Sequence, residues 1–280
     1  MKNGKQFELN YEFVLNSDCH LGEGLYVEDS LSCWVDITKK KLFLYKDSKL
    51  QSYKLKSSVS VIYEVIENKI IIGSSEGILD FNYEDKIEKL QKFNLIQISN
   101  ESRSNDGGLL NNKKIISYMN ENPKLNLGSI YMVEGNNLKL IENKISIPNS
   151  FIALNKKDML ISDSYSGEIW CYTFDSRGKV KSKNLWSKVK KNISPDGGCK
   201  IKNLIFISLW DDFSIGVFDL NGNLIDKLLL QVPRPTNCKF NSLKSQLWVT
   251  TAKEGLSEID LKKYPLSGDT FIYDLSSYFK

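Results

Sequence analysis

Short apolar runs recur along the chain at a nearly constant interval. Their central residues, which are 37 to 46 positions apart, are Val35, Ile72, Ile116, Ile161, Ile207 and Val249. A period of roughly 40–50 residues made only of short strands is typical of a β-propeller, in which each repeat forms one four-stranded blade. The pattern therefore predicts an all-β, six-bladed propeller, with residues 1–280 as a single domain.

Alternating apolar positions also mark both ends of the chain. Residues 7–15 alternate as a strand, and residues 270–275 are apolar and rich in β-forming residues. A propeller removes its open edges by pairing the first strand of the chain with the last blade. We therefore expect the strand near residues 8–14 to close the ring beside the last blade.

A carboxylate or amide residue precedes five of the six apolar runs by 11 or 12 positions. These residues are Glu23, Asn105, Asn149, Asp196 and Asn237, and the remaining blade has Ser60 near this phase. Because the innermost strand of every blade runs along the central channel, equivalent positions form a ring around its axis. Oxygen ligands of this kind suit a hard cation such as calcium, magnesium or manganese.

Turn chemistry is the alternative explanation of the same residues. Asn and Asp are common before strands, and Glu23, Asn149 and Asp196 each lie beside Gly or Pro. Glu is not a favoured turn residue, so position 23 favours the cation site.

Four ordered motifs resemble the gluconolactonase/regucalcin (senescence marker protein) family of six-bladed propellers. They are Leu-Gly-Glu-Gly at 21–24 followed by Trp-Val-Asp at 34–36, Arg-Ser-Asn-Asp-Gly at 103–107, Ile-Pro-Asn at 147–149 followed by Asp-Ser at 163–164, and Ser-Pro-Asp-Gly at 194–197. The resemblance covers almost the whole chain, and the order and spacing of the motifs make it specific. Ser150 departs from the family pattern, which has Gly there, and residues 108–113 depart from the usual continuation of the second motif.

The resemblance implies a role for each matching residue. Glu23, Asn149 and Asp196 would bind one divalent cation, with calcium first and zinc, manganese or magnesium as alternatives. Arg103 and Asn105 would contact the substrate, and Glu121 is the nearest match to a further substrate-binding acidic residue. The substrate implied is a small-molecule lactone.

The same residues support hydrolysis on chemical grounds. Two carboxylates and one amide leave open positions on a cation for water and substrate, and a bound cation acts as a Lewis acid. Asp196 could both ligate the cation and take the proton of the attacking water, and Arg103 offers a forked donor for an oxygen-rich substrate.

Composition removes several competing classes. The single histidine, His20, leaves little basis for Ser-His-Asp catalysis, and the five cysteines are odd in number with no Cys-x-x-Cys pair. The formal net charge of +4 comes without a dense basic cluster, so no nucleic-acid partner is expected. The sequence has no apolar run of signal-peptide or membrane-spanning length, which together with unpaired cysteines predicts a cytoplasmic protein without a membrane partner.

Three functions remain open from the residues. The first is a cation-dependent lactonase, with Asp196 as ligand and general base. The second is an organophosphate hydrolase, because the same cation would polarise a phosphoryl group. The third is a non-catalytic calcium-binding propeller, since fold and metal alone do not make an enzyme. The loops at 118–127 and 210–214 are where the choice of substrate is expected to lie.

Overall fold

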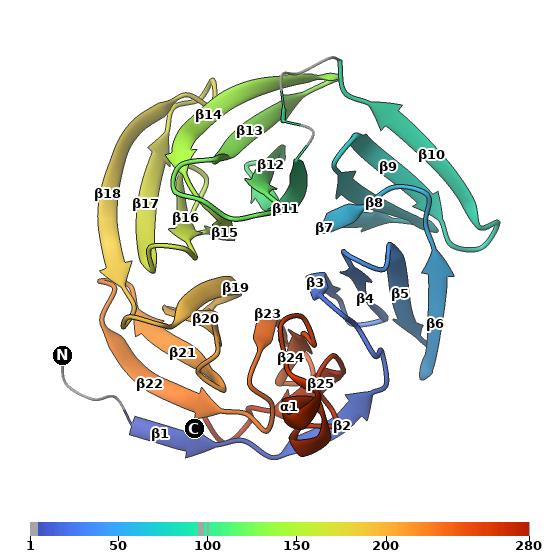
Figure 1. Ribbon diagram of the computed structural model, residues 1–280, viewed down its shortest axis with the longest axis vertical. Helices are drawn as coiled ribbons and strands as arrows, with labels where there is room; N and C mark the ends of the chain where they lie inside the picture. The colour runs from blue at the N-terminus through green and yellow to red at the C-terminus, as the bar shows by residue number, and fades with distance from the viewer. Residues whose placement is uncertain (1–4, 95–97, 100, 280) are drawn as a thin grey trace.

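Six sheets stand in a ring around a central axis (Figure 1), which confirms the predicted six-bladed β-propeller. The molecule is described here by a computed structural model that covers residues 5–94, 98–99 and 101–279. The four strands that make up each blade pair antiparallel, and the first three of them are consecutive in the chain. The sequence period therefore corresponds to one blade.

The strands take equivalent places in every blade. The innermost strands are β3 (Gly22–Val27), β7 (Val59–Ile66), β11 (Ser102–Leu110), β15 (Pro148–Ala153), β19 (Ser194–Ile201) and β23 (Pro235–Asn241). The second strands are β4 (Leu31–Asp36), β8 (Lys69–Ser74), β12 (Lys113–Asn120), β16 (Asp158–Asp163), β20 (Leu204–Trp210) and β24 (Gln246–Thr251). The third strands are β5 (Lys41–Lys46), β9 (Gly77–Asn82), β13 (Gly128–Glu134), β17 (Glu168–Phe174), β21 (Ser214–Asp219) and β25 (Thr270–Asp274). The outer strands are β6 (Lys49–Lys54), β10 (Ile87–Lys92), β14 (Asn137–Ile145), β18 (Val180–Lys188), β22 (Leu224–Leu229) and β2 (Tyr11–Leu15).

The apolar runs of the sequence form the second strands, where burial is complete. All six of their central residues, from Val35 to Val249, have 0% exposure. Such strands lie between two neighbours of their own sheet and are covered on both faces by adjacent blades, so they consist of nearly continuous apolar residues. The outer strands are largely exposed and alternate in polarity, as β6 does.

The N-terminal segment joins two blades rather than one. As predicted, β2 closes the ring: it pairs antiparallel with β25 and is the outer strand of the last blade. Before it, β1 (Lys5–Glu8) pairs parallel with β22 and adds a fifth strand to the preceding blade. The chain crosses from one blade to the next at residues 9–10, so the segment formed by β1 and β2 connects the last two blades (Figure 1).

A bulge interrupts every innermost strand at the polar position found in the sequence. The pairing of first and second strands shifts register at Glu23, Ser60, Asn105, Asn149, Asp196 and Asn237, or directly beside them. Bulges re-aim side chains and are frequent next to binding sites. Here they turn one polar residue of each blade out of the alternating pattern of its strand.

One short helix, α1 (Glu258–Lys263), lies between β24 and β25 and is capped by Ser257. No helix in the described part of the chain is long and apolar enough to cross a membrane.

Candidate cation and substrate site

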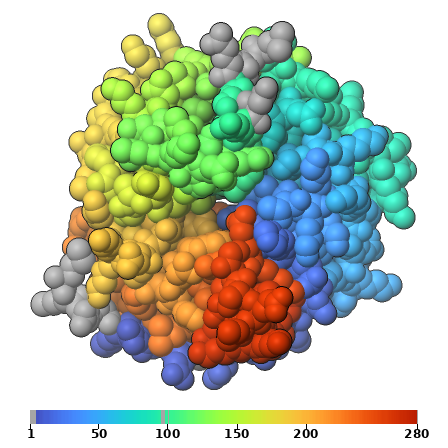
Figure 2. Space-filling model, in the orientation of Figure 1, coloured from blue at the N-terminus to red at the C-terminus, as the bar shows by residue number. Residues whose placement is uncertain are grey.

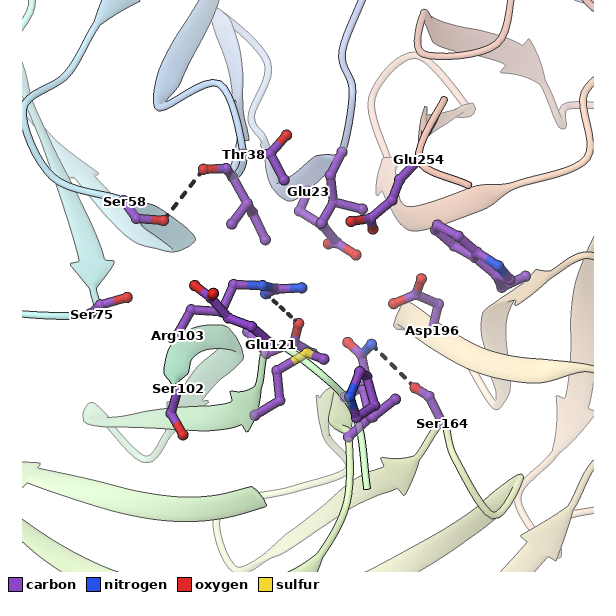
Figure 3. A pocket seen from close by; sticks show the side chains of 18 of the residues that line it. Glu23, Thr38, Ser58, Ser75, Ser102, Arg103, Glu121, Ser164, Asp196 and Glu254 are labelled. Atoms are coloured by element: carbon purple, nitrogen blue, oxygen red, sulfur yellow. Dashed lines mark hydrogen bonds between the residues drawn. The ribbon is translucent and has the colours of Figure 1, made fainter. Parts of the chain in front are cut away.

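A pocket of about 860 Å³ opens near the centre of the ring, where the surface is hollowed (Figure 2). All six residues selected from the sequence line it: Glu23, Arg103, Asn105, Glu121, Asn149 and Asp196. They come from four different blades, and the labelled members point into the same space (Figure 3). The structure thus brings together residues that are up to 173 positions apart (Glu23 to Asp196).

The side-chain amide of Asn149 is oriented by a neighbouring hydroxyl. Its Nδ2 donates to the Oγ of Ser164 (3.3 Å), and that hydroxyl donates to the carbonyl of Pro195 in the next blade (2.7 Å). The amide oxygen Oδ1 is buried and has no hydrogen-bond partner. A buried, unpaired acceptor is costly, so this oxygen is suited to a ligand of positive character.

Ser150 stands where the family resembled in sequence has Gly. Its φ is 58°, a left-handed conformation in which Gly carries no steric penalty. The Ser150 hydroxyl donates to the carbonyl of Asp196, which ties blade four to blade five beside the site. Ser150 therefore holds a left-handed backbone conformation and at the same time supplies a hydrogen bond to the neighbouring blade.

Glu23 and Asp196 are two buried carboxylates that line the same pocket. Glu23 is 4% exposed and Asp196 is 6% exposed. Burial raises the pKa of Glu23 to about 7, and burial together with the charge of Glu23 raises the pKa of Asp196 well above its usual range. Glu23 also accepts hydrogen bonds from the amide of Asn237 (3.2 Å) and the backbone N–H of Gly24 (3.1 Å).

Asp106 is a third buried carboxylate on the axis, and sequence analysis did not select it. Burial raises the pKa of Asp106 to about 6. Hydrogen bonds from the backbone N–H groups of Gly107, Phe151 and Ser150 act in the opposite direction and lower it. It faces a smaller cavity of about 210 Å³ that Asn237 and Lys239 also line. Its place directly after Asn105, inside the Arg-Ser-Asn-Asp-Gly motif, was the signal that could have found it.

Arg103 and Asn105 form a hydrogen-bonded pair on β11. The Nη1 of Arg103 donates to Asn105 Oδ1 (2.8 Å) and to the carbonyl of Ser104 (3.1 Å). Asn105 Nδ2 donates to the carbonyl of Pro148 (3.1 Å). Within the described residues no hydrogen bond engages the other two nitrogens of the guanidinium, so Asn105 orients a donor group whose remaining N–H bonds face the pocket.

Glu121 and two further residues, Trp210 and Glu254, complete the wall of the pocket. Glu121 follows β12 at the rim and is exposed, and Trp210 lies at the end of β20, within the 210–214 segment expected to influence substrate choice. Glu254, in the loop after β24, also lines the pocket. Sequence analysis did not select Glu254, because it lies in a loop and does not precede an apolar run by 11 or 12 positions.

The donor set fits a hard cation. The buried Oδ1 atoms of Asn149 and Asn237 lack hydrogen-bond partners, and the carboxylates of Glu23 and Asp196 in the same pocket region form no ion pair with any lysine or arginine that the structure describes. Among the described residues there is no group of three or more His, Cys, Asp or Glu side chains arranged for a metal. The candidate site instead combines two carboxylates with amide oxygens, a set that matches calcium better than zinc.

The comparison with known protein families identifies the relationship. The profile of the SMP-30/Gluconolactonase/LRE-like region matches residues 21–253. The chain belongs to this family. The match contains all four motifs and every proposed site residue except Glu254, which directly follows it.

Solved structures share the fold of this family member. Regucalcin from Agrobacterium tumefaciens, described as a calcium-binding protein, is 21% identical with a TM-score of 0.88, covering 96% of this chain and 95% of its own. A luciferin-regenerating enzyme is 19% identical with a TM-score of 0.81, and 92% of each chain is covered. A gluconolactonase from Xanthomonas campestris is 13% identical with a TM-score of 0.69, covering 92% of this chain and 87% of its own.

The buried carboxylates predict an unusual pH dependence for the protein stripped of metal. Carboxyl groups with raised pKa values bind more protons in the folded than in the unfolded state. Proton binding by these groups therefore stabilises the folded protein fully below about pH 4, and this contribution is lost as the pH rises through about 7. We expect the melting temperature to fall by about 5 °C between pH 5 and pH 8. Calcium should remove this dependence of the melting temperature on pH, because it would bind the carboxylates in place of the protons.

Differential scanning calorimetry with chelator and with calcium measures both curves. The double variant Glu23→Gln/Asp196→Asn serves as the control and should show a much flatter profile without metal. A metal-free protein that becomes more stable from pH 5 to pH 8 would contradict this account of the site.

Proposed function

We propose that this protein is a divalent-cation-dependent hydrolase that opens the ring of a small lactone. The observation that carries the proposal is the floor of the pocket, where the carboxylates of Glu23 and Asp196 and the unpaired oxygen of Asn149 converge. Arg103 stands in the same pocket as a hydrogen-bond donor for substrate. The gluconolactonase and the calcium-binding regucalcin among the structural neighbours agree with this chemistry.

Glu23, Asn149 and Asp196 would hold the cation. When bound there, the cation would polarise the carbonyl of the lactone and lower the pKa of the attacking water. Calcium is the first candidate because all proposed ligand atoms are oxygens, with zinc, manganese and magnesium to be compared.

Asp196 would also move the proton. As general base it accepts a proton from the water whose oxygen attacks the carbonyl carbon. The bond between that carbon and the ring oxygen then breaks, and the ring oxygen takes up the proton to become an alcohol. The product is a hydroxy acid, and Asp196 returns to its starting state.

Arg103, Asn105 and Glu121 would position the substrate. Arg103 donates to a substrate oxygen, and Asn105 holds the guanidinium in the required direction through the 2.8 Å bond. Glu121 at the rim can accept from a substrate hydroxyl. As a cationic donor in the pocket, Arg103 would also stabilise the oxyanion that develops during the reaction.

The experiment that tests the proposal is hydrolysis of a lactone panel by metal-stripped protein, with calcium, manganese, magnesium or zinc added back. Turnover that depends on one of these ions supports the lactonase. Hydrolysis confined to a phosphotriester probe would replace it with the organophosphate hydrolase, and calcium binding without any turnover would replace it with a binding protein.

Cation affinity gives a separate prediction. Glu23→Gln keeps the shape of the side chain but removes one of two charged ligands, so calcium affinity should fall by about 100-fold. Isothermal titration calorimetry of the purified variant measures this directly. Glu84→Gln, in the exposed turn after β9, is the matched control and should bind calcium as the unmodified protein does. Equal affinity in Glu23→Gln and the unmodified protein would remove Glu23 from the ligand set.

A further inference from the structure

Glu254 presents an unpaired carboxylate to the pocket. It follows β24, is half-buried and lines the cavity (Figure 3). Across the described part of the chain its side chain makes no hydrogen bond and no ion pair within 4.0 Å. A carboxylate in this position has its acceptor capacity available to a ligand.

The backbone of Glu254 is fixed from both sides. Its N–H donates to the carbonyl of His20 (2.9 Å), as does the N–H of Lys253 (2.9 Å). Its own carbonyl accepts a hydrogen bond from the guanidinium of Arg234. The residue therefore has a defined position although it lies in a loop, which is what a binding residue requires.

Arg234 is itself held by the wall of the pocket. It forms an ion pair with Asp211 (Nε to Oδ1, 2.7 Å), and its guanidinium lies 4.9 Å above the ring of Trp210. Gly255 makes room for it, because a Cβ at that position would lie 2.7 Å from the Arg234 Nη1. Arg234 thus connects Trp210 to Glu254 through direct contacts with both. We call these three residues the Trp210 wall.

Glu254 and Arg103 are complementary across the pocket. Burial lowers the pKa of Arg103, whereas the negative charges of nearby carboxylates raise it. Glu254 contributes most among these carboxylates. The two side chains nevertheless form no direct ion pair. A substrate hydroxyl between them can accept from the guanidinium and donate to the carboxylate, whereas an unsubstituted ring carbon can do neither.

We propose that Glu254 is a specificity-determining residue that accepts a hydrogen bond from a ring hydroxyl of the substrate, so that hydroxylated lactones are selected over unsubstituted ones. The inference rests on the proposed lactonase function for the pocket. Selection of this kind is effective because a site built for a hydroxyl leaves a polar group unpaired when the hydroxyl is missing. The Trp210 wall holds the acceptor in place for this contact.

The test compares two lactones of the same ring size, one carrying hydroxyl groups and one unsubstituted, on the calcium-loaded protein and on Glu254→Gln. We expect kcat/KM for the hydroxylated lactone to fall by about 10- to 100-fold, mainly through KM, and kcat/KM for the unsubstituted lactone to stay within about twofold. Glu258→Gln removes an exposed charge from α1 nearby and should change neither value. An equal effect on both lactones, no effect on either, or the same effect in Glu258→Gln would overturn the proposal.

A binding measurement separates this inference from the function itself. The probe is a cyclic polyhydroxy ether, which has the ring and hydroxyls of the substrate but no carbonyl to hydrolyse. If neither lactone is turned over, the lactonase proposal fails, and calorimetric binding of the ether still decides the role of Glu254. At least tenfold weaker binding to Glu254→Gln supports that role; unchanged binding, or none to the unmodified protein, overturns it.

Discussion

Asp196→Asn is expected to lower kcat/KM for cation-dependent lactone opening by at least about 1,000-fold, because one substitution takes away a charged ligand and the general base together. Asn has nearly the same shape as Asp, and the Gly197 N–H that donates to the Asp196 carboxylate (3.0 Å) would still find an amide oxygen there. The fold should therefore survive. Without metal, the variant should even melt higher than the unmodified protein at pH 8, since one buried carboxylate is gone.

Steady-state kinetics with saturating calcium, together with a thermal melt, measure this prediction. Asp85→Asn, in the exposed turn after β9, is the matched control and should leave kinetics unchanged. Calcium titration of Asp196→Asn tells the two roles apart: lost binding identifies mainly a ligand, and retained binding with lost turnover identifies mainly a base. A variant that keeps one tenth or more of the activity would contradict both roles.

Deletion of residues 1–16 is expected to abolish the cooperative unfolding transition. The deletion removes β2 and leaves β25 as an open edge, although Phe271, Ile272 and Tyr273 on that strand are only 0–2% exposed in the intact ring. Tyr11, which packs edge-on against Phe271 at 5.6 Å, is lost as well. An open apolar edge also favours pairing between molecules, so the product should aggregate.

A shorter deletion of residues 1–9 provides the comparison. It removes β1 but keeps β2, and β22 retains its partner β21 in the same blade. This variant should stay folded with a melting temperature lowered by only a few degrees. Circular dichroism and size-exclusion chromatography distinguish the two proteins. A cooperative, monomeric melt of the 1–16 deletion would show that the closing strand is dispensable.

The repeat of apolar runs was sufficient to predict the architecture. Every second strand lies between blades, so its residues must be apolar at each repeat, and Val35 or Ile207 can be recognised without knowledge of the rest of the fold. The N-terminal closure was predictable for the same reason, since a ring leaves no edge. The additional pairing of β1 with the preceding blade was not, because β1 is short, exposed and carries no strong pattern.

The sequence by itself also determined which residues of the inner strands meet, because the propeller repeats one position around one axis. What only the tertiary structure decided is how they face each other. The bulges that turn Glu23 and Asp196 inward depend on strand register, and the raised pKa values of these carboxylates depend on burial. Glu254 and Asp106 belong to neither the repeat phase nor a metal motif. For Asp106 the neighbouring motif residues were the only local signal. The place of Glu254 follows from packing between blades, which acts between residues distant in sequence and leaves no local pattern in the chain.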